Sequence, residues 1–437
     1  FDSTTNTSSI ELEVGADANG DGQINVDDVE LIRSYVAKYD YDSEKEEKTY
    51  ALQDVTDSLK LHGRTSVTSD GIICDHSATG IEFSAYIEGK VELTVLVSAN
   101  TYFTVYVDGE RQITRYNAQN GTVTLTIANF VEGGVHNIRV LKQTESANSL
   151  CVLQSITFKG SFEEAPAEKD LFIEFLGDSI TSGFGNMCMN GADNAGSALN
   201  QDATQTYAYL AAQKLGADHS LISCSGIGVT SSWSGDFTMK DFFASQSYFR
   251  STSAKYEKTF TPDIVVINLG TNDNSKGSDA AQFKEDVKAL IALVRSTYGE
   301  DVKIVWAANM MGACMQTYSQ AAINELGGEA AGLYFCTLTA NQEGGYYHPS
   351  KAGHVVAATE LANIISDGII MQGESGWAKT LEKNNGDYWK AIKEMAIQQA
   401  HQQHRQQRQA DINCRCFAFF PKQPYGVLAV ISVGQQT

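Results

Sequence analysis

The spacing of apolar residues changes along the chain and divides it into segments. Across residues 55–161, apolar and polar side chains alternate, as in Ile81-Phe83-Ala85-Ile87 and Val91-Leu93-Val95-Val97. A period of two predicts β-strands with one buried face. Turn sequences separate these strands at Asp108-Gly109, Asn120-Gly121 and Glu132-Gly133-Gly134. We therefore expect an all-β sandwich of the jelly-roll type.

From residue 170 to residue 372, continuous apolar runs alternate with helical periodicity. Residues 280–298 and 351–366 carry the helical pattern. The strand-like runs are Leu171–Leu176, Ser220–Cys224, Asp263–Leu269, Val302–Ala307 and Gly332–Leu338. Alternating strands and helices predict a parallel sheet with helices on both faces, which is a three-layer α/β/α domain. Ligands of such domains bind at the carboxyl ends of the strands.

Residues 1–45 contain an acidic loop that is typical of a calcium site, followed by a helical pattern. Its oxygen ligands are Asp17, Asn19, Asp21, Gln23, Asn25 and Asp28, with Gln23 offering its main-chain carbonyl. Ca²⁺ prefers oxygen ligands, and Gly22 occupies the position where such a loop turns sharply. The loop resembles a dockerin repeat, which implies structural Ca²⁺ and a cohesin-bearing scaffold protein as a partner. A dockerin normally carries two repeats and we find one, so either the first lies upstream of Phe1 or this is a single degenerate copy.

The C-terminal residues 373–437 differ in composition from the rest of the chain. Gln and His dominate residues 398–409, and a short apolar end follows. We expect a disordered or non-native tail. His401 and His404 leave a metal-binding tract as the alternative.

The charge and composition narrow the choice of partner and location. The chain has 53 acidic and 32 basic residues, a net charge of −21, which argues against nucleic acid and anionic membranes as partners. No apolar run approaches the roughly 20 residues of a membrane helix, and Phe1 opens no basic and apolar leader, so we expect a mature product or a fragment. The 37 glycines and 5 prolines suit loop-rich β structure and a secreted, extracellular protein. The eight cysteines lack CxxC pairs, and we expect most of them to be small buried hydrophobic residues.

Four short motifs hold the groups that acyl transfer requires. Gly177-Asp178-Ser179, Ser225-Gly226 and Asn272-Asp273 each follow a strand-like run, and His348-Pro349 opens the last helical pattern. Acyl transfer needs a nucleophile, a base and oxyanion donors within hydrogen-bond reach of one another. Ser179, His348, Gly226 and Asn272 supply these groups.

The order of these motifs resembles that of an SGNH (GDSL-type) hydrolase. The resemblance implies that Gly226 and Asn272 donate to the oxyanion together with the Ser179 amide. Gly228 is a second candidate for the glycine role. We expect Asp273 to brace its loop rather than to take part in the chemistry.

The sequence departs from the SGNH pattern at one position. The usual acid three residues before the histidine is replaced by Gly345. A carboxylate at that position fixes the imidazole tautomer and stabilises its cation. We predict that a main-chain carbonyl orients the Nδ1–H of His348, with Glu343 as the alternative. His354, six residues further on, is expected to be a packing or capping histidine.

A β domain directly ahead of an SGNH domain, with Leu61-His62-Gly63-Arg64 at its entry, resembles carbohydrate esterase family 2 over residues 55–370. The resemblance implies removal of acetyl groups from acetylated plant polysaccharides such as xylan and glucomannan, with no cofactor for catalysis. Trp233, Tyr346 and Tyr347 are the candidates for contact with a sugar ring.

Several alternatives stay open at this stage. The β domain is either a carbohydrate-binding module or, as we expect from its lack of spaced aromatic residues, a wall of the neighbouring site. The whole protein is alternatively a non-catalytic, scaffold-attached polysaccharide-binding protein with a degenerate hydrolase domain. A lipase or thioesterase on the same fold is the third interpretation, although no apolar lid-like segment is present.

Overall fold

The computed structural model describes residues 23, 25–28, 30–31, 46–191, 196–247, 255–312 and 314–370. The chain divides into two compact units, Phe1–Ile364 and Ile365–Thr437. The second unit is described only as far as Ile370. Its described part consists of Ile365, which is the last residue of α8, and a π-helical turn, η8 (Ser366–Ile370). The predicted tail at 373–437 therefore lies outside the described residues. Among the described helices, none combines the length and apolar character needed to cross a membrane.

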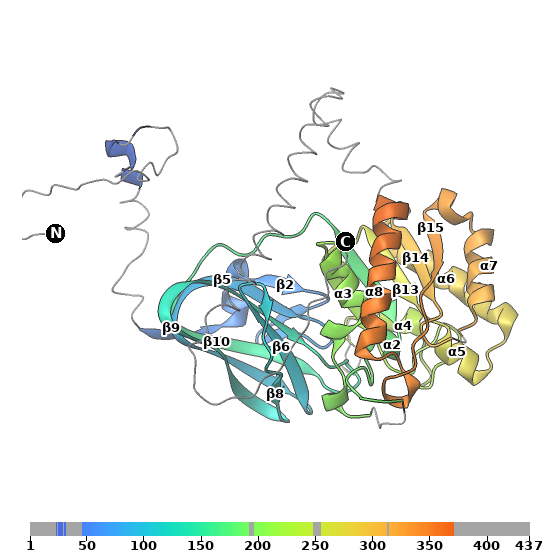
Figure 1. Cartoon of the computed structure of the whole chain (residues 1–437), viewed down its shortest axis with the longest axis horizontal. Helices are drawn as coiled ribbons and strands as arrows, with labels where there is room; N and C mark the ends of the chain where they lie inside the picture. The colour runs from blue at the N-terminus through green and yellow to red at the C-terminus, as the bar shows by residue number, and fades with distance from the viewer. Residues whose placement is uncertain are drawn as a thin grey trace, which may run out of the picture. The chain divides into compact units, whose positions relative to one another are not determined.

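The first domain of the larger unit, which we call the β domain (residues 47–162), is one antiparallel sheet of ten strands (Figure 1). Its strands are β1 (Glu47–Ala51), β2 (Lys60–His62), β3 (Ser66–Thr68), β4 (Gly71–Ile73), β5 (Gly80–Val97), β6 (Thr101–Val107), β7 (Glu110–Arg111), β8 (Tyr116–Ala118), β9 (Gly121–Lys142) and β10 (Cys151–Phe162). The main path runs β3-β4-β10-β5-β9-β6-β7. The apolar residues of the two alternating patterns in β5 are all at most 1% exposed, which confirms the predicted buried face.

Two details of the predicted β domain are wrong. Glu132-Gly133-Gly134 is not a chain reversal, because β9 continues through it to Lys142. The pairing of β5 with β9 instead shifts register between Ile87 and Gly89, so the two long strands are irregular there without ending. The domain also begins before residue 55, since β1 pairs along β10. The antiparallel character is confirmed, and the jelly-roll assignment stays a prediction.

The second domain, the α/β domain (residues 172–364 in the first unit), contains the predicted parallel sheet. Its strands, in the spatial order β12-β11-β13-β14-β15, are β12 (Asp218–Ser223), β11 (Phe172–Gly177), β13 (Ile264–Asn268), β14 (Lys303–Ala308) and β15 (Leu333–Thr337). The helices are α2 (Ser179–Ser182), α3 (Tyr207–Lys214), α4 (Met239–Phe243), α5 (Thr271–Lys276), α6 (Ala280–Tyr298), α7 (Gln316–Glu325) and α8 (Lys351–Ile365). Each strand lies within two residues of its predicted bounds, and α6 has the predicted bounds.

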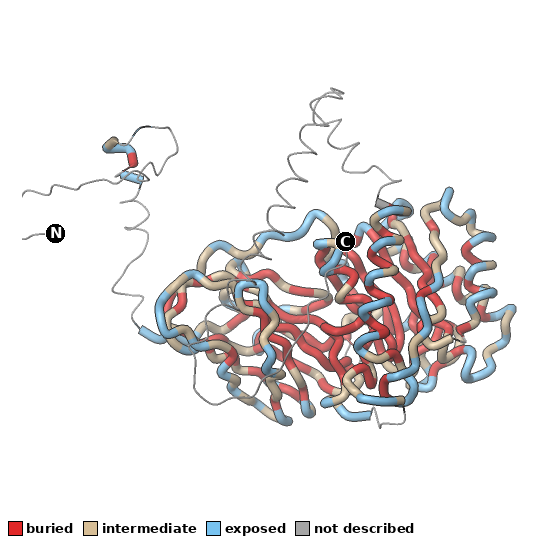
Figure 2. The backbone as a smooth tube through the Cα atoms, in the orientation of Figure 1, coloured by how far each residue is buried: buried red, intermediate tan, exposed pale blue. Residues whose placement is uncertain are grey.

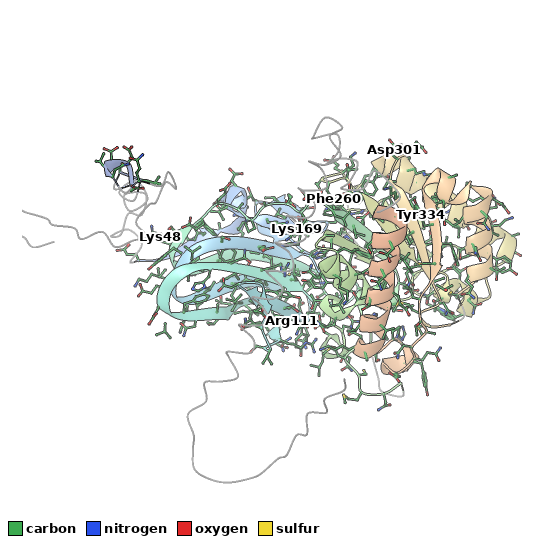
Figure 3. All side chains as sticks on the ribbon, turned by 45° about the horizontal axis from the view of Figure 1, so that its top comes forward. Lys48, Arg111, Lys169, Phe260, Asp301 and Tyr334 are labelled. Atoms are coloured by element: carbon green, nitrogen blue, oxygen red, sulfur yellow. The ribbon has the colours of Figure 1, made fainter. Side chains whose placement is uncertain are left out.

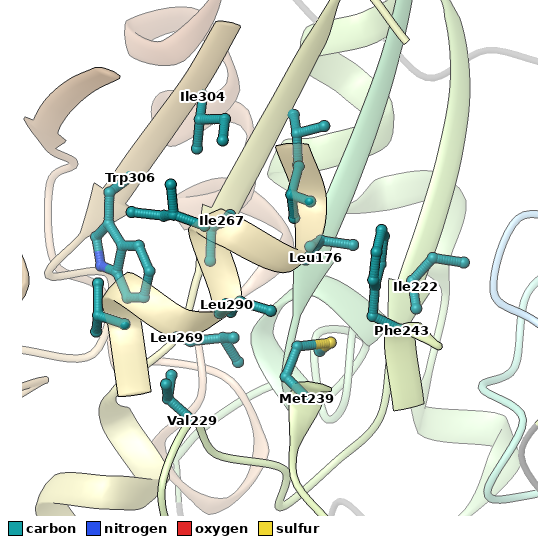
Figure 4. Close-up of a cluster of buried hydrophobic side chains, with 14 of the residues drawn as sticks. Leu176, Ile222, Val229, Met239, Phe243, Ile267, Leu269, Leu290, Ile304 and Trp306 are labelled. Carbon is teal, nitrogen blue, oxygen red and sulfur yellow. The ribbon is translucent and has the colours of Figure 1, made fainter. Parts of the chain in front are cut away.

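Helices cover both faces of this sheet because successive strand residues point to opposite sides. Leu176 on β11 belongs to a buried cluster with residues of α4, α6 and α7, and Figure 4 shows Leu176, Met239, Phe243 and Leu290 in it. The neighbouring Phe175 contacts Tyr207 of α3 on the other face, with ring centroids 6.2 Å apart. The strands β11, β12, β13 and β14 are buried along most of their length, whereas the edge strand β15 is only partly buried (Figure 2). Such burial explains why they form continuous apolar runs in the sequence.

Buried polar contacts join the β domain to the α/β domain. The Arg64 guanidinium donates to the main-chain oxygens of Phe243 and Ser245, at 2.7 and 3.0 Å. Arg111, labelled in Figure 3, lies 2.6 Å from the Asp202 carboxylate across the same interface. Lys60 Nζ lies 2.7 Å from Asp218 at the start of β12. The two domains therefore share an interior rather than meeting as separate surfaces.

Candidate active site

The ends of three neighbouring strands bring the predicted motifs together. In the sheet, Gly177 at the end of β11 pairs with Ser223 of β12 and with Asn268 of β13. The chain turns sharply after Gly177, where a Cβ would stand 2.0 Å from Thr181 Oγ1, so only glycine fits. The Asp178 carboxylate then caps α2 by accepting the Ile180 amide at 2.9 Å. Ser179 is thus placed as the first residue of a helix, just past the carboxyl end of β11.

Ser179 and His348 meet at this edge although 169 residues separate them. His348 Nε2 lies 2.8 Å from Ser179 Oγ. His348 follows the single turn η7 (Gly345–Tyr347) and precedes α8, as its motif predicted. The distance is within the range for a base that takes a proton from a nucleophile.

Two main-chain carbonyls hold the other face of the imidazole. His348 Nδ1 lies 3.2 Å from Gly345 O and 3.1 Å from Tyr346 O, which confirms the prediction of carbonyl orientation. The alternative was wrong, because the Glu343 carboxylate instead accepts from Asn341 Nδ2 at 3.0 Å and from Ser350 Oγ at 3.3 Å. Two carbonyl acceptors require a proton on Nδ1, which leaves Nε2 as the basic nitrogen facing Ser179.

The turn that supplies these carbonyls is strained. Tyr346 and Tyr347 have φ angles of 48° and 57°, in the left-handed region that side-chain-bearing residues rarely adopt. Hydrogen bonds fix the turn, since Gly345 N donates to Gly185 O and Tyr347 N donates to Gly191 O. Strain of this kind is held at functional sites by the surrounding structure.

Burial sets the proton affinity of the base. Desolvation lowers the pKa of His348 below its usual value, and the hydrogen bonds to the Tyr346 and Gly345 carbonyls partly oppose the shift. The imidazole is therefore neutral, and able to accept a proton, at neutral pH.

Gly226 fits the oxyanion role better than Gly228. The Gly228 amide donates to Ser232 Oγ at 3.0 Å, whereas the Gly226 amide makes no hydrogen bond to the part of the chain that the structure describes. Gly226 also has φ +82°. The Ser179 amide, at the first position of α2, likewise has no acceptor within its own helix.

Asn272 lies at the start of α5, beside the serine turn. Its Nδ2 is 2.8 Å from Ile227 O and 3.2 Å from Asp178 Oδ2. Asn272 is therefore bonded to Ile227, which follows Gly226, and to Asp178, which precedes Ser179. Burial raises the pKa of Asp178 to about 7, and the nearby Asp273 contributes to the shift.

Asp273 braces the loop, as predicted. Its carboxylate accepts the amides of Val229, Thr230 and Ser231 at 2.7 to 3.0 Å. His354 is also structural, because it is fully buried and its Nδ1 accepts the Tyr207 amide at 3.0 Å.

Comparison with known protein families accounts for both domains. Residues 175–356 match the GDSL-like lipase/acylhydrolase family, and residues 61–166 match the carbohydrate esterase 2 N-terminal family. The α/β domain is thus a GDSL-like acylhydrolase domain, and we call it the acylhydrolase domain from here on. The β domain ahead of it corresponds to the carbohydrate esterase 2 N-terminal domain.

Two curated relatives resemble the chain over more than 300 residues. The chain is 27% identical over 310 residues to the cellulase/esterase CelE of Acetivibrio thermocellus, covering 67% of this chain and 37% of CelE. It thus spans little more than a third of that relative. It is 24% identical over 319 residues to an acetylxylan esterase / glucomannan deacetylase of Cellvibrio japonicus, covering 69% of this chain and 87% of the relative.

Solved structures show the same fold. A family two carbohydrate esterase from Clostridium thermocellum, in complex with cellohexaose, superposes with a TM-score of 0.63 at 26% identity, covering 71% of this chain and 98% of that one. A family two carbohydrate esterase from Cellvibrio japonicus superposes with a TM-score of 0.67 at 20% identity, covering 74% and 98%.

The acylhydrolase domain exposes the three predicted aromatic side chains. Trp233, Tyr346 and Tyr347 are 63%, 53% and 59% exposed. Trp233 is tied to the loop that holds Gly226, because its amide donates to Gly226 O at 2.7 Å, and its Nε1 donates to Ser275 Oγ. Tyr346 and Tyr347 belong to the turn that orients His348. All three therefore belong to loops that also carry predicted site residues, and their contact with a sugar ring stays a prediction.

One contact to the loop that holds Gly226 comes from the β domain, and no sequence pattern predicts it. Glu145 of the β domain bonds to Ser225, the residue before Gly226. Its role depends on a contact across 80 residues and on no local pattern.

The predicted calcium ligands lie only partly within the described residues. Asp17, Asn19 and Asp21 lie outside the described residues, while Gln23, Asn25 and Asp28 lie within them. Residues 26–28 and 30–31 are helical, so helical structure begins at Val26, within the predicted loop of residues 17–28, rather than after it. The Asn25 amide donates to Asp28 Oδ2 at 2.8 Å, and the Asp27 amide donates to Asn25 Oδ1 at 2.7 Å. These bonds cap the start of the helical residues, and the calcium site stays a prediction.

Proposed function

We propose that this protein is a secreted carbohydrate esterase that removes O-acetyl groups from plant cell-wall polysaccharide, such as xylan or glucomannan. The observation that carries the proposal is the 2.8 Å contact between Ser179 Oγ and His348 Nε2. The acetylxylan esterase name of the Cellvibrio japonicus relative supports the substrate class. The β domain of the carbohydrate esterase 2 type supports it further.

The chemistry follows from the positions of the two side chains. Ser179 Oγ attacks the acetyl carbon while its proton passes to His348 Nε2. The tetrahedral intermediate then collapses, the bond from the acetyl carbon to the sugar oxygen breaks, and Nε2 returns the proton to that oxygen. Water attacks the acetyl-serine by the same route, which releases acetate and restores Ser179.

The negative oxygen of each intermediate needs donors near Ser179. The amides of Ser179 and Gly226 and the side chain of Asn272 fill this role. Asn272 Nδ2 already contacts Asp178 Oδ2, at the longer of its two distances, 3.2 Å. In the intermediate, the acetyl oxygen competes with the Asp178 carboxylate for this N–H. Because the pKa of Asp178 is raised, its carboxyl group carries less negative charge and competes less strongly.

The surroundings of the pair favour a polysaccharide over a lipid. Trp233, Tyr346 and Tyr347 offer flat, exposed surfaces for sugar rings. A groove of about 760 Å³ adjoins the histidine loop, and its lining mixes polar residues such as Asn186 and Gln342 with apolar ones such as Met187 and Met189.

The direct test is hydrolysis of p-nitrophenyl acetate and release of acetate from acetylated xylan and glucomannan. Ser179→Ala should abolish both activities. Ser182→Ala is the matched control, because Ser182 Oγ in the same turn donates to Asp178 O and should leave kcat nearly unchanged. Rising activity from p-nitrophenyl acetate to the octanoate would indicate a lipase. Polysaccharide binding without any hydrolysis would indicate a degenerate, non-catalytic domain.

We also propose that residues 17–28 bind structural Ca²⁺ and that the repeat docks to a cohesin-bearing scaffold. The bonds among Asn25, Asp27 and Asp28 support a calcium loop. Calorimetric titration with Ca²⁺ tests the first proposal, and Asp21→Ala should weaken binding without affecting esterase activity. Co-purification with a recombinant cohesin, in Ca²⁺ and in EDTA, tests the second.

A further inference from the structure

A carboxylate of the β domain reaches into the loop that holds the oxyanion glycine. Glu145 follows β9 and is 2% exposed. Its Oε2 accepts the Ser225 amide at 2.6 Å, and its Oε1 accepts the Ser225 hydroxyl at 2.7 Å. One carboxylate therefore binds both donors of the residue directly before Gly226. Charge-assisted pairs of this kind are short and directional.

The peptide that carries the Gly226 amide begins at Ser225. Gly226 has φ +82° and no side chain, so its own torsions do little to fix the direction of its N–H. Hydrogen bonds on either side must do so instead. The Trp233 amide donates to Gly226 O at 2.7 Å on one side, and Glu145 holds Ser225 on the other. An oxyanion donor stabilises a transition state only when it is already aimed.

Glu145 is itself fixed from both domains. Gln201 Nε2 of the acylhydrolase domain donates to its Oε1 at 3.1 Å. The buried Lys142 ammonium donates to the main-chain oxygens of Thr144, Glu145 and Asp75, at 2.8, 3.1 and 2.8 Å. Lys142 thus rigidifies the backbone beneath Glu145 and places a positive charge near the carboxylate. The arrangement is a pre-organised support rather than a surface contact.

We propose that Glu145 is the positioning residue of the oxyanion loop, so that the β domain completes the active site of the acylhydrolase domain. The proposal rests on the esterase function proposed above. It gives the β domain a role in catalysis even for a substrate too small to contact it.

The test compares kcat for p-nitrophenyl acetate among variants of the full chain. Glu145→Ala should lower kcat about 10²-fold, which is the effect of losing one oxyanion donor. The kcat of Glu145→Gln should lie between that of Glu145→Ala and that of wild type, because the single amide oxygen replaces only one of the two carboxylate oxygens that accept from the Ser225 amide and hydroxyl. The acid limb of the pH–rate profile, which reports His348, should not move in either variant.

Lys60→Met is the matched control for a damaged domain interface. It breaks a buried interdomain ion pair with Asp218, at the opposite end of β12 from Ser225. This variant should lower Tm but keep kcat within about twofold of wild type. If Glu145→Ala fails to fold, Glu145→Gln and Ser225→Ala, which removes only the hydroxyl bond, decide the question.

The outcomes separate the two proposals. Folded Glu145→Ala or Glu145→Gln with wild-type kcat overturns the positioning role and leaves the esterase function standing. A kcat loss in Lys60→Met equal to that in Glu145→Gln also overturns it, because the effect would then be general loosening of the interface. A wild-type protein that does not hydrolyse p-nitrophenyl acetate contradicts the proposed function and the role of Glu145 with it.

Discussion

Ser179 Oγ lies 2.8 Å from His348 Nε2, and the opposite nitrogen of that imidazole faces two main-chain carbonyls. Carbonyl dipoles fix the tautomer as a carboxylate would, but they offer only partial charge to the imidazolium that forms during the reaction. The geometry therefore separates two functions that an acid normally combines, namely orientation and charge stabilisation.

Loss of the base His348 should lower kcat far more than loss of Glu343, the acid closest to it in the sequence. His348→Ala should lower kcat for p-nitrophenyl acetate about 10²–10⁴-fold, since general-base catalysis contributes that much. Glu343→Ala should change kcat less than about threefold, because its carboxylate bonds to Asn341 and Ser350 rather than to the imidazole. A thousandfold loss in Glu343→Ala would show that the acid, not the carbonyls, orients His348.

The pH dependence should report a base with a lowered pKa. Burial lowers the pKa of His348 below 6.5, so Nε2 stays unprotonated to more acidic pH than an exposed histidine would. The acid limb of kcat/KM should therefore have its midpoint below pH 6.5. Initial rates between pH 4.5 and 8 measure it, and a midpoint above 6.5 would contradict the assignment of His348 as a desolvated base.

Asn272 should contribute to the transition state rather than to substrate binding. Asn272→Ala should lower kcat about 10²–10³-fold, the usual loss for one oxyanion donor, with little change in KM. Asn274→Ala is the matched control, since Asn274 is an exposed asparagine on the same helix. Equal losses in the two variants would mean that damage to α5, and not loss of a donor, is responsible.

Much of the fold could be predicted because the spacing of apolar residues agreed with the residues that begin and end each element. The bounds of α6 were predictable since Asp279 caps its first turn, accepting the Gln282 amide at 2.9 Å, and Gly299 ends it. The β9 irregularity was mispredicted because Gly133-Gly134 resembles a turn, whereas the long pairing with β5 continues past it. At this position, strand pairing in the folded protein overrides the local turn preference of the sequence.

The catalytic residues were predictable from motifs, but their supports were not. Tyr346 and Tyr347 adopt left-handed torsions that their residue type disfavours, so no propensity indicates the turn that orients His348. Glu145 and Arg64 are charged residues in a segment whose prediction rested on apolar alternation. Their burial depends on partners in the other domain, which lie more than 50 residues away.

Buried histidines at the domain interface should make folding sensitive to acid. Burial lowers the pKa of His219 to about 3, and its Nε2 donates to Ala78 O at 3.0 Å. The unfolded chain binds a proton near pH 6.5 and the folded chain does not, so the contribution of His219 is present above pH 6.5 and is lost as pH falls below it. Relative to His219→Gln, wild type should lose about 1.4 kcal/mol of unfolding free energy per pH unit between 6.5 and 4.5. Urea unfolding at several pH values measures this, and parallel curves for the two proteins would contradict it.

Arg64 should be the most costly single loss at the domain interface. Its guanidinium is fully enclosed, with Cζ 3.5 Å from the centre of the Tyr256 ring and Nη2 3.4 Å from Glu174 Oε1. Arg64→Met leaves the Glu174 carboxylate buried without its countercharge, and breaking such a pair costs about 3–5 kcal/mol of unfolding free energy.

The pH dependence of this loss distinguishes an unpaired charge from a packing defect. Burial already raises the pKa of Glu174, and removing Arg64 should raise it further. A carboxyl with a raised pKa destabilises the folded state as pH rises through that pKa, so the deficit of Arg64→Met should be larger at pH 8 than at pH 5.5. The double variant Arg64→Met, Glu174→Gln should recover part of the loss, because a neutral amide needs no countercharge. A deficit that is equal at both pH values and unchanged in the double variant would assign the loss to packing around Tyr256 instead.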